Sequence, residues 1–334
     1  MQISYGLYVF CFLATSGEYK LNFQKKKNSP RRKLTTVLSQ LIPVAPSLDI
    51  WPPGPGQLLE PQVPNAELVD ILNQIDTNRI QAIIQKLTTF GTRHTLSSQT
   101  DPVRGIGAAR DWIASEMRAI AATSNGRMTV TVQEFVQQPS GTVIPNPTNI
   151  TNVFITLTGS KEPNRAYVVS GHYDSRVTDL NDFTDDAPGA DDDASGVAVS
   201  MELARVMATH DSAATLIFAA VAGEEQGLFG SAFMAAQLKK DGVDVQGMLD
   251  NDIVGSSTAD DGTIDKFDLR MFVQGIPTID NSSEISELTA IGAENDSPSH
   301  QLGRFVSEVS QNTLTQMNGM CDSQNRNLVL FVYI

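Results

Sequence analysis

The sequence predicts an α/β sandwich built on a largely parallel sheet, and two observations lead to this fold class. From about Val69 onward, strand-like segments alternate with helix-like segments, which is typical of strands linked by crossover helices. Three of the strand-like segments are nearly continuous apolar runs, as expected of strands covered on both faces. The 334 residues, of which 41% are hydrophobic and 19% charged, are sufficient for a packed core.

The individual elements follow from the spacing of apolar residues. Residues 79–90 and 105–124 have helical spacing, and residues 127–137 (RMTVTVQEFVQ) alternate as a half-buried strand does. Further strands are predicted at TNVFITLTG (151–159), AYVVSGHYD (166–174), TLIFAAVAGEE (215–225) and KFDLRMFVQG (266–275). Further helices are predicted at Ser195–His210, Leu228–Lys240 and Ser297–Leu314.

The first 65 residues differ from the rest of the chain. Residues 1–16 contain a short apolar run followed by small residues, which predicts a possible signal peptide. Residues 17–65 are basic and then proline-rich, which indicates a pro-region or linker. Residues 66–334 are predicted to form the folded domain. Sequons at Asn149 and Asn281 agree with secretion, the predicted localisation.

Charge and cysteine content narrow the function classes. The net charge of −14 disfavours nucleic acid and anionic membranes as partners, because their phosphates would be repelled. No apolar run is long enough to predict stable membrane insertion. The two cysteines, Cys11 and Cys321, can build neither a disulfide scaffold nor a cysteine zinc site. The oligomeric state is left open by the sequence.

Acidic residues gather just before a predicted helix. Six aspartates lie between Asp182 and Asp193, and the chain then becomes almost wholly apolar. Like charges at close range repel one another, and their burial is costly unless a positive group compensates. A metal ion is the simplest such group.

Other ionisable side chains stand where the predicted strands end. They are His172 and Asp174, then Glu224 and Glu225, then Asp250 and Asp252. The carboxyl ends of parallel strands meet at one edge of a sheet, so these side chains are expected to converge there. One imidazole with several carboxylates suits zinc better than calcium or magnesium, although manganese or cobalt could substitute.

A competing motif occurs in the same stretch. DDDASGVAVSME has the residue spacing of a calcium-binding EF-hand loop. An EF-hand requires a helix before its loop, and Pro188 and Gly189 interrupt any helix there. The calcium interpretation is therefore disfavoured.

Four motifs in this order, SGHYDS, PGADDDASGVA, GEEQGLFGS and NDIVG, closely resemble the co-catalytic, two-zinc aminopeptidase family of leucyl aminopeptidase type. Glutamate carboxypeptidase and glutaminyl cyclase are relatives of that family. FGTRHT at residues 90–95 resembles its N-terminal signature, and the likeness spans about Ala66 to Leu314. The resemblance implies a three-layer α/β/α sandwich with a mixed, mostly parallel central sheet.

The resemblance also implies metal ligands. His172 and Asp252 would hold one zinc, Glu225 would hold the other, and Asp192 would bridge both. The expected activity is release of N-terminal residues from peptides with a free N-terminus.

The resemblance assigns further roles around the metals. Glu224 would be the general base acting on a metal-bridging hydroxide, and Asp174 would orient His172. Asp191 and Asp193 would support the ligands or the start of the helix. The acidic site would suit the cationic α-amine of the substrate.

The sequence departs from the family in one respect. The family supplies another histidine ligand in a loop beyond the last predicted helix, whereas this chain has only His94, His172, His210 and His300. The domain is therefore expected to be truncated at its C-terminal end, with about one tightly bound zinc, little or no aminopeptidase activity and an exposed apolar end, LVLFVYI. The alternatives are an inactive homologue that binds metal or peptide, and a glutaminyl cyclase-like acyltransferase.

Overall fold

The computed structural model describes residues 66–258, 261–262, 264, 270–276, 282–313 and 329–333. The predicted signal peptide (1–16), the predicted pro-region (17–65) and the sequon at Asn281 lie outside the described residues. Secretion therefore stays a prediction. Among the described residues, no helix is both long and apolar enough to cross a membrane.

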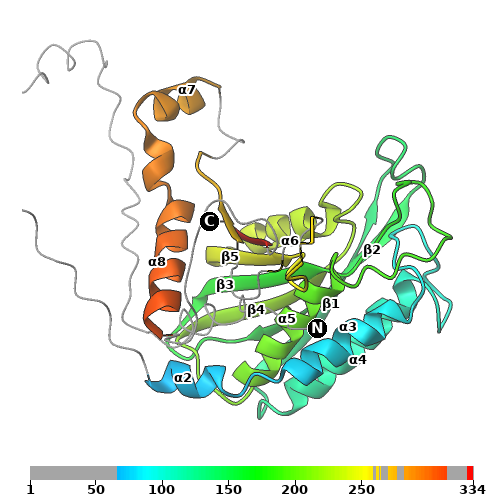
Figure 1. Ribbon diagram of the computed structural model, residues 1–334, viewed down its shortest axis with the longest axis horizontal. Helices are drawn as coiled ribbons and strands as arrows, with labels where there is room; N and C mark the ends of the chain where they lie inside the picture. Colours follow the sequence, from blue (N-terminus) through cyan, green and yellow to red (C-terminus); the bar gives the residue numbers. More distant parts are fainter. Residues whose placement is uncertain are drawn as a thin grey trace, which may run out of the picture. The chain divides into compact units, whose positions relative to one another are not determined.

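The described strands form one sheet with the order β1-β2-β4-β3-β5-β7-β6 (Figure 1). The strands are β1 (Met128–Gln137), β2 (Thr148–Leu157), β3 (Glu162–His172), β4 (Ala214–Val221), β5 (Asp244–Asp252), β6 (Arg270–Val273) and β7 (Val329–Tyr333). The helices are α2 (Ala66–Leu72), α3 (Thr77–Thr88), α4 (Ile106–Ala122), α5 (Ala194–Met207), α6 (Phe229–Lys240), α7 (Ser282–Ala290) and α8 (Pro298–Thr313), with a short 3-10 helix, η4 (Ala293–Asp296).

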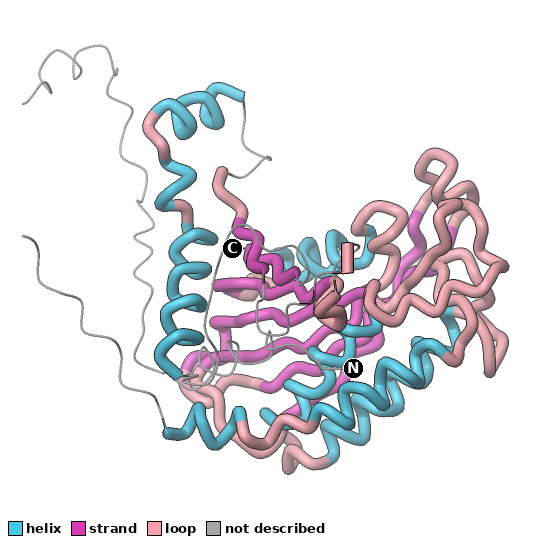
Figure 2. The backbone as a smooth tube through the Cα atoms, in the orientation of Figure 1, coloured by secondary structure: helices cyan, strands magenta, loops and turns pink. Residues whose placement is uncertain are grey.

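The sheet is the middle of three layers, as the predicted sandwich requires. Residues of α3, α4, α5 and α8 share one hydrophobic core with the side chains on one face of the sheet, including Val153, Val169 and Phe218. The other face, including Phe154, Val168 and Ile217, packs with Met234 and Leu238 of α6 in a second core. Figure 2 shows helices beside the strands of this sheet. All of β4 is buried, because both of its faces are covered.

The prediction that the sheet is mostly parallel is not confirmed. Pairs β3–β4, β3–β5 and β6–β7 are parallel, but pairs β1–β2, β2–β4 and β5–β7 are antiparallel. The parallel pairs in the centre follow from the crossover helices α5 and α6, which return the chain to the same end of the sheet. Strands β1 and β2 are joined without a helix, so they pair antiparallel.

Several elements were not predicted correctly from the sequence. Strand β7 was expected to be an exposed apolar end, but its backbone pairs with β5 on one side and β6 on the other. This pairing was not predicted, because strand pairing between distant segments leaves no local pattern, and the exposure of the apolar side chains stays a prediction. Strand β5 was not predicted as an element either, and Asp250 and Asp252 lie within it. Of the predicted strand 266–275, residues 270–273 form β6, and residues 266–269 lie outside the described residues.

The start of α5 is fixed tightly against β5. Asp193 caps the helix, since its Oδ1 accepts a hydrogen bond from the Gly196 amide at 2.8 Å. A Cβ at Gly196 would lie 1.9 Å from the carbonyl oxygen of Asn251 in β5. The Asn251 carbonyl belongs to the sheet backbone and cannot move aside, so only glycine allows this close approach. The approach brings Asp192 beside the end of β5.

The change Gly196→Ala is expected to destabilise the protein by about 1–3 kcal/mol, because the added methyl forces α5 away from β5. Gly303→Ala is the matched control in α8, where the added Cβ would meet only side chains, chiefly Val273, which can move. Urea unfolding of both variants measures the difference. Equal losses in the two variants would contradict this role for Gly196.

Candidate metal centre

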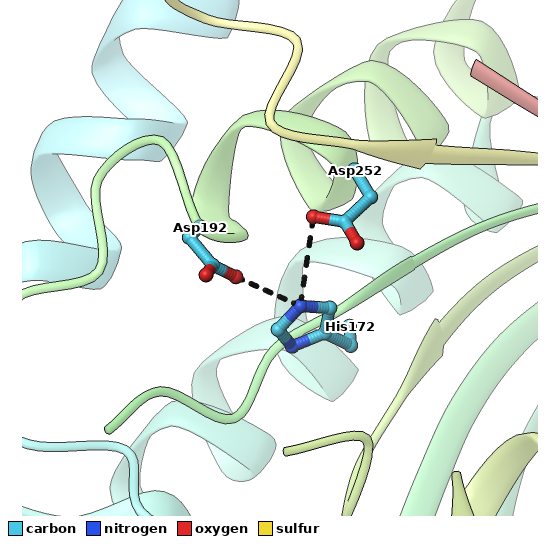
Figure 3. Close-up of side chains that lie close together, drawn as sticks. All are labelled: His172, Asp192 and Asp252. Carbon is cyan, nitrogen blue, oxygen red and sulfur yellow. Dashed lines mark ion pairs between the residues drawn. The ribbon is translucent and has the colours of Figure 1, made fainter. Parts of the chain in front are cut away.

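Three predicted ligands converge at one edge of the sheet. His172 is the last residue of β3, Asp252 is the last residue of β5, and Asp192 lies just before α5. One ligand atom from each residue lies within 4.8 Å of the other two. Figure 3 shows the two carboxylates pointing at the imidazole. The predicted convergence at the carboxyl ends of parallel strands is therefore present for His172 and Asp252, and Asp192, which the family resemblance implied as a ligand, joins them.

The imidazole of His172 is the centre of the cluster. Its Nε2 lies 3.0 Å from Oδ1 of Asp192 and 3.9 Å from Oδ1 of Asp252. Oε2 of Glu224 lies 3.8 Å from the same nitrogen. The histidine side chain is only 3% exposed, whereas that of Asp192 is 48% exposed. The Asp192 carboxylate is therefore open to solvent, although the imidazole nitrogen beside it is buried.

Asp174 holds the other side of the imidazole. Nδ1 of His172 lies 3.1 Å from the Asp174 carbonyl oxygen and 3.5 Å from its Oδ1. Because these oxygens can only accept, Nδ1 carries the proton and Nε2 is the nitrogen directed at the cluster. The Asp174 carboxylate also accepts hydrogen bonds from the amides of Glu224 and Glu225 at 3.3 and 3.1 Å. Asp174 therefore ties the predicted base to the predicted ligand.

The charges in the cluster are strongly coupled. Burial opposes a charge on His172, but hydrogen bonds to Asp174 and Asp192 outweigh it and raise the pKa of the imidazole well above its usual value. Burial also raises the pKa of Asp252 to about 6. Without a metal, the site thus retains protons that a metal ion would have to displace.

The residues fit a zinc ion. Oδ1 of Asp252 is buried and has no hydrogen-bond partner within the described part of the chain, which is costly for a polar atom. It faces the same space as Nε2 of His172 and the carboxylate of Asp192. One imidazole nitrogen and two carboxylates form a ligand set that zinc accepts.

Glu224 has the properties of a proton carrier. Its carboxyl group is 30% exposed and lies at the edge of the cluster. Burial raises its pKa to about 7, and the nearby charges of Asp174, Glu225 and Asp252 act in the same direction. A carboxyl group that titrates near neutral pH can both accept and donate a proton there.

Glu225, the predicted ligand of a second zinc, does not join the three-residue cluster. Its side chain is 9% exposed, and Oε2 accepts a hydrogen bond from Nε of Arg176 at 2.5 Å. Arg176 was not among the residues predicted from the sequence. It follows SGHYDS directly, which was a signal that a cation stands beside the predicted ligands.

The remaining strand-end and loop aspartates support the cluster. Asp193 is fully buried, and its Oδ2 accepts a hydrogen bond from the His172 amide at 2.9 Å while Oδ1 caps α5. Oδ1 of Asp191 accepts from the Gly255 amide at 2.7 Å. Asp250 accepts a hydrogen bond from the hydroxyl of Ser170. These aspartates hold the backbone that carries the ligands.

Arg93, within the FGTRHT segment, joins the two loops of the site. Its side chain is fully buried and donates hydrogen bonds to the carbonyl oxygens of Tyr173 at 2.7 Å, Pro188 at 2.6 Å and Gly189 at 2.9 Å. Tyr173 follows His172, and Pro188 and Gly189 precede the three aspartates. Burial lowers the pKa of Arg93 to about 10, so it remains positively charged near the acidic cluster.

The other three histidines, all within the described residues, lie elsewhere. Nε2 of His94 faces the carbonyl oxygen of Leu180, and Nε2 of His210 lies 3.0 Å from Nε2 of Gln74. Nδ1 of His300 contacts the carbonyl oxygen of Glu294. None of them contacts Glu225, so His172 is the imidazole of this site in the described part of the chain.

With zinc removed by a chelator, Asp252 is expected to make stability depend on pH. Its pKa is about 6 in the folded protein and about 3.9 when unfolded. The folded state therefore binds the Asp252 proton more tightly than the unfolded state does. The stability that this proton contributes is fully present at low pH and is lost as pH rises through about 6. Asp252→Asn, which is always neutral, should gain stability relative to the parent between pH 5 and pH 8. Urea midpoints that differ by the same amount at both pH values would contradict the assignment.

Comparison with known proteins adds independent findings. Residues 152–283, which include every residue of the cluster, match peptidase family M28. A "Probable zinc metalloprotease" of Pyricularia oryzae is 56% identical over 271 residues, 80% of this chain and 54% of that protein. Another protein of the same description, from Pyrenophora teres f. teres, is 53% identical over 271 residues, 80% of this chain and 56% of that protein.

The chain spans about half the length of the curated relatives it matches. Among solved structures, LapB of Legionella pneumophila is similar with a TM-score of 0.47 and 25% identity, over 59% of this chain and 49% of that chain. The ordered motifs around His172, Asp192, Glu224 and Asp252 lie within the matched region. Residues 152–283 are thus the part of this chain that is similar to peptidase family M28.

Proposed function

We propose that the protein is a zinc-dependent exopeptidase of the aminopeptidase type, which hydrolyses N-terminal residues from peptides. The position of Glu224 beside the ligand cluster supports this most strongly. A carboxyl group with a pKa of about 7 lies 3.8 Å from the imidazole nitrogen that faces Asp192 and Asp252. The names of the relatives, zinc metalloproteases, support the same reaction class.

The geometry suggests a separate role for each residue of the site. His172, Asp192 and Asp252 would hold the zinc. Bound zinc lowers the pKa of water toward neutrality and polarises the carbonyl of the scissile bond. Glu224 accepts a proton at its carboxylate and passes it to the leaving amine, and its pKa near 7 suits both steps.

The acidic surroundings favour a substrate with a free N-terminus. The side chains of Asp192 and Glu224 are 48% and 30% exposed, so their carboxylates can be reached from solvent. A protonated α-amine entering this negative region is attracted to it, whereas a peptide carboxylate is repelled. This charge preference favours an aminopeptidase over a carboxypeptidase.

A second candidate is a glutaminyl cyclase-like acyltransferase that uses one zinc. One observation favours it: the described residues contain a ligand cluster for one zinc, and Glu225 pairs with Arg176 and is not part of that cluster. Release of free N-terminal amino acids, measured against cyclisation of an N-terminal glutamine, distinguishes the two reactions.

Glu224→Gln tests the proposed base. In a form of the protein that hydrolyses an aminoacyl anilide, the change is expected to reduce turnover by roughly two to four orders of magnitude, the usual contribution of a general base. Zinc content should stay the same, because Glu224 is not in the ligand cluster.

Glu116→Gln is the control for this test, since Glu116 is similarly exposed at 35% but pairs with Arg79. It should leave turnover unchanged. Near-normal turnover of the Glu224→Gln variant would rule out the assigned role.

A further inference from the structure

We propose that Arg176 is the second cation of this site, and that its guanidinium competes with a metal ion for the carboxylate of Glu225. The proposal rests on the proposed function in one respect, namely that zinc binds at the cluster around His172. It assigns to Arg176 control over how strongly a second metal is held.

The contact geometry places Arg176 on Glu225. Arg176 follows Asp174 by two positions, in the loop after β3. Its Nε donates a hydrogen bond to Oε2 of Glu225 at 2.5 Å, and its Nη1 donates to the carbonyl oxygen of Val177 at 3.2 Å. A guanidinium and a metal ion cannot occupy the same side of one carboxylate oxygen. Zinc can therefore bind Oε2 of Glu225 from that side only when Arg176 withdraws.

The two partners differ in how freely they can move. The side chain of Glu225 is 9% exposed, and that of Arg176 is 37% exposed. The amide of Glu225 is also bonded to the buried Asp174 carboxylate, which fixes its backbone. A nearly buried carboxylate needs a cation, whereas a long, partly exposed arginine can swing into solvent. Exchange of one cation for another is thus open to Glu225.

Arg176 lies near the same carboxylates that would attract a second metal ion. The hydrogen bond to Glu225 raises the pKa of Arg176, and the charges of Asp192 and Glu224 raise it further. The guanidinium therefore lies within the field of all three carboxylates. While it remains there, it repels an incoming divalent ion and offsets part of the negative charge that would attract one.

The described residues supply few other ligands for a second zinc ion. Beside Glu225 and the shared Asp192, none of the chain's four histidines reaches this position. Zinc is held firmly by three or four protein ligands, so two carboxylates alone bind it weakly. Under these conditions, a single ion pair is enough to change the occupancy of the second position.

Zinc titration by calorimetry tests the proposal, with the parent chain compared with Arg176→Gln. The first equivalent should bind equally in both proteins. The second should bind roughly tenfold more tightly in Arg176→Gln, because a charge-assisted hydrogen bond no longer has to be broken. Arg176→Lys, which keeps the charge but not the planar fork, should fall between them and serves if Arg176→Gln does not fold.

Two controls isolate the pair. Arg165→Gln removes the same charge from a similar ion pair, in which Arg165 contacts Glu162 at 2.8 Å at the opposite end of β3. It should leave both affinities unchanged. In a Glu225→Gln background, Arg176→Gln should have no effect on the second affinity, since the carboxylate under competition is gone.

The outcomes separate the two proposals. A second affinity in Arg176→Gln that is unchanged, weaker or undetectable overturns the competition, as does an equal gain in Arg165→Gln. If the parent chain fails to bind even the first zinc, the proposed function itself falls. A normal first equivalent with no response to Arg176→Gln removes only the role of Arg176.

Discussion

The site depends on one buried imidazole with carboxylates on both of its nitrogens. His172 ends a buried strand, so its ring is 3% exposed and cannot turn away from Asp174 on one side or Asp192 and Asp252 on the other. In a low-dielectric environment such charges interact strongly, and an unpaired one is costly. The surrounding structure therefore has to hold each partner in place, and a metal ion relieves the repulsion that remains between the carboxylates.

Backbone contacts meet that requirement. Arg93 donates hydrogen bonds to the carbonyl oxygen of Tyr173, next to His172, and to that of Pro188, just before the three aspartates. Asp193 accepts hydrogen bonds from the His172 amide and from the first turn of α5. Gly196 then allows α5 to approach β5 closely enough to bring Asp192 near Asp252. The fold thus converts three separate strand and helix ends into one ligand cluster, and Asp174 links that cluster to Glu224.

Sequence patterns predicted the parts of this arrangement that local spacing determines. The layered fold, helices α5, α6 and α8, and the convergence of His172 and Asp252 were predictable, because apolar periodicity and parallel strand ends carry that information. Asp192 was singled out as a ligand only by the resemblance to a known family. The antiparallel pairing of β7 was not predictable, because contacts between distant segments leave no periodic trace. For the same reason, the partner of Glu225 was missed: an ion pair with Arg176 spans 49 positions in sequence.

Anomalous diffraction at the zinc absorption edge, from crystals of the zinc-loaded protein, tests the central claim most directly. The account predicts a strong peak about 2.0–2.2 Å from Nε2 of His172 and from carboxylate oxygens of Asp192 and Asp252. A zinc ion bound elsewhere, for example at His94 or His300, with His172 still paired only to carboxylates, would contradict it.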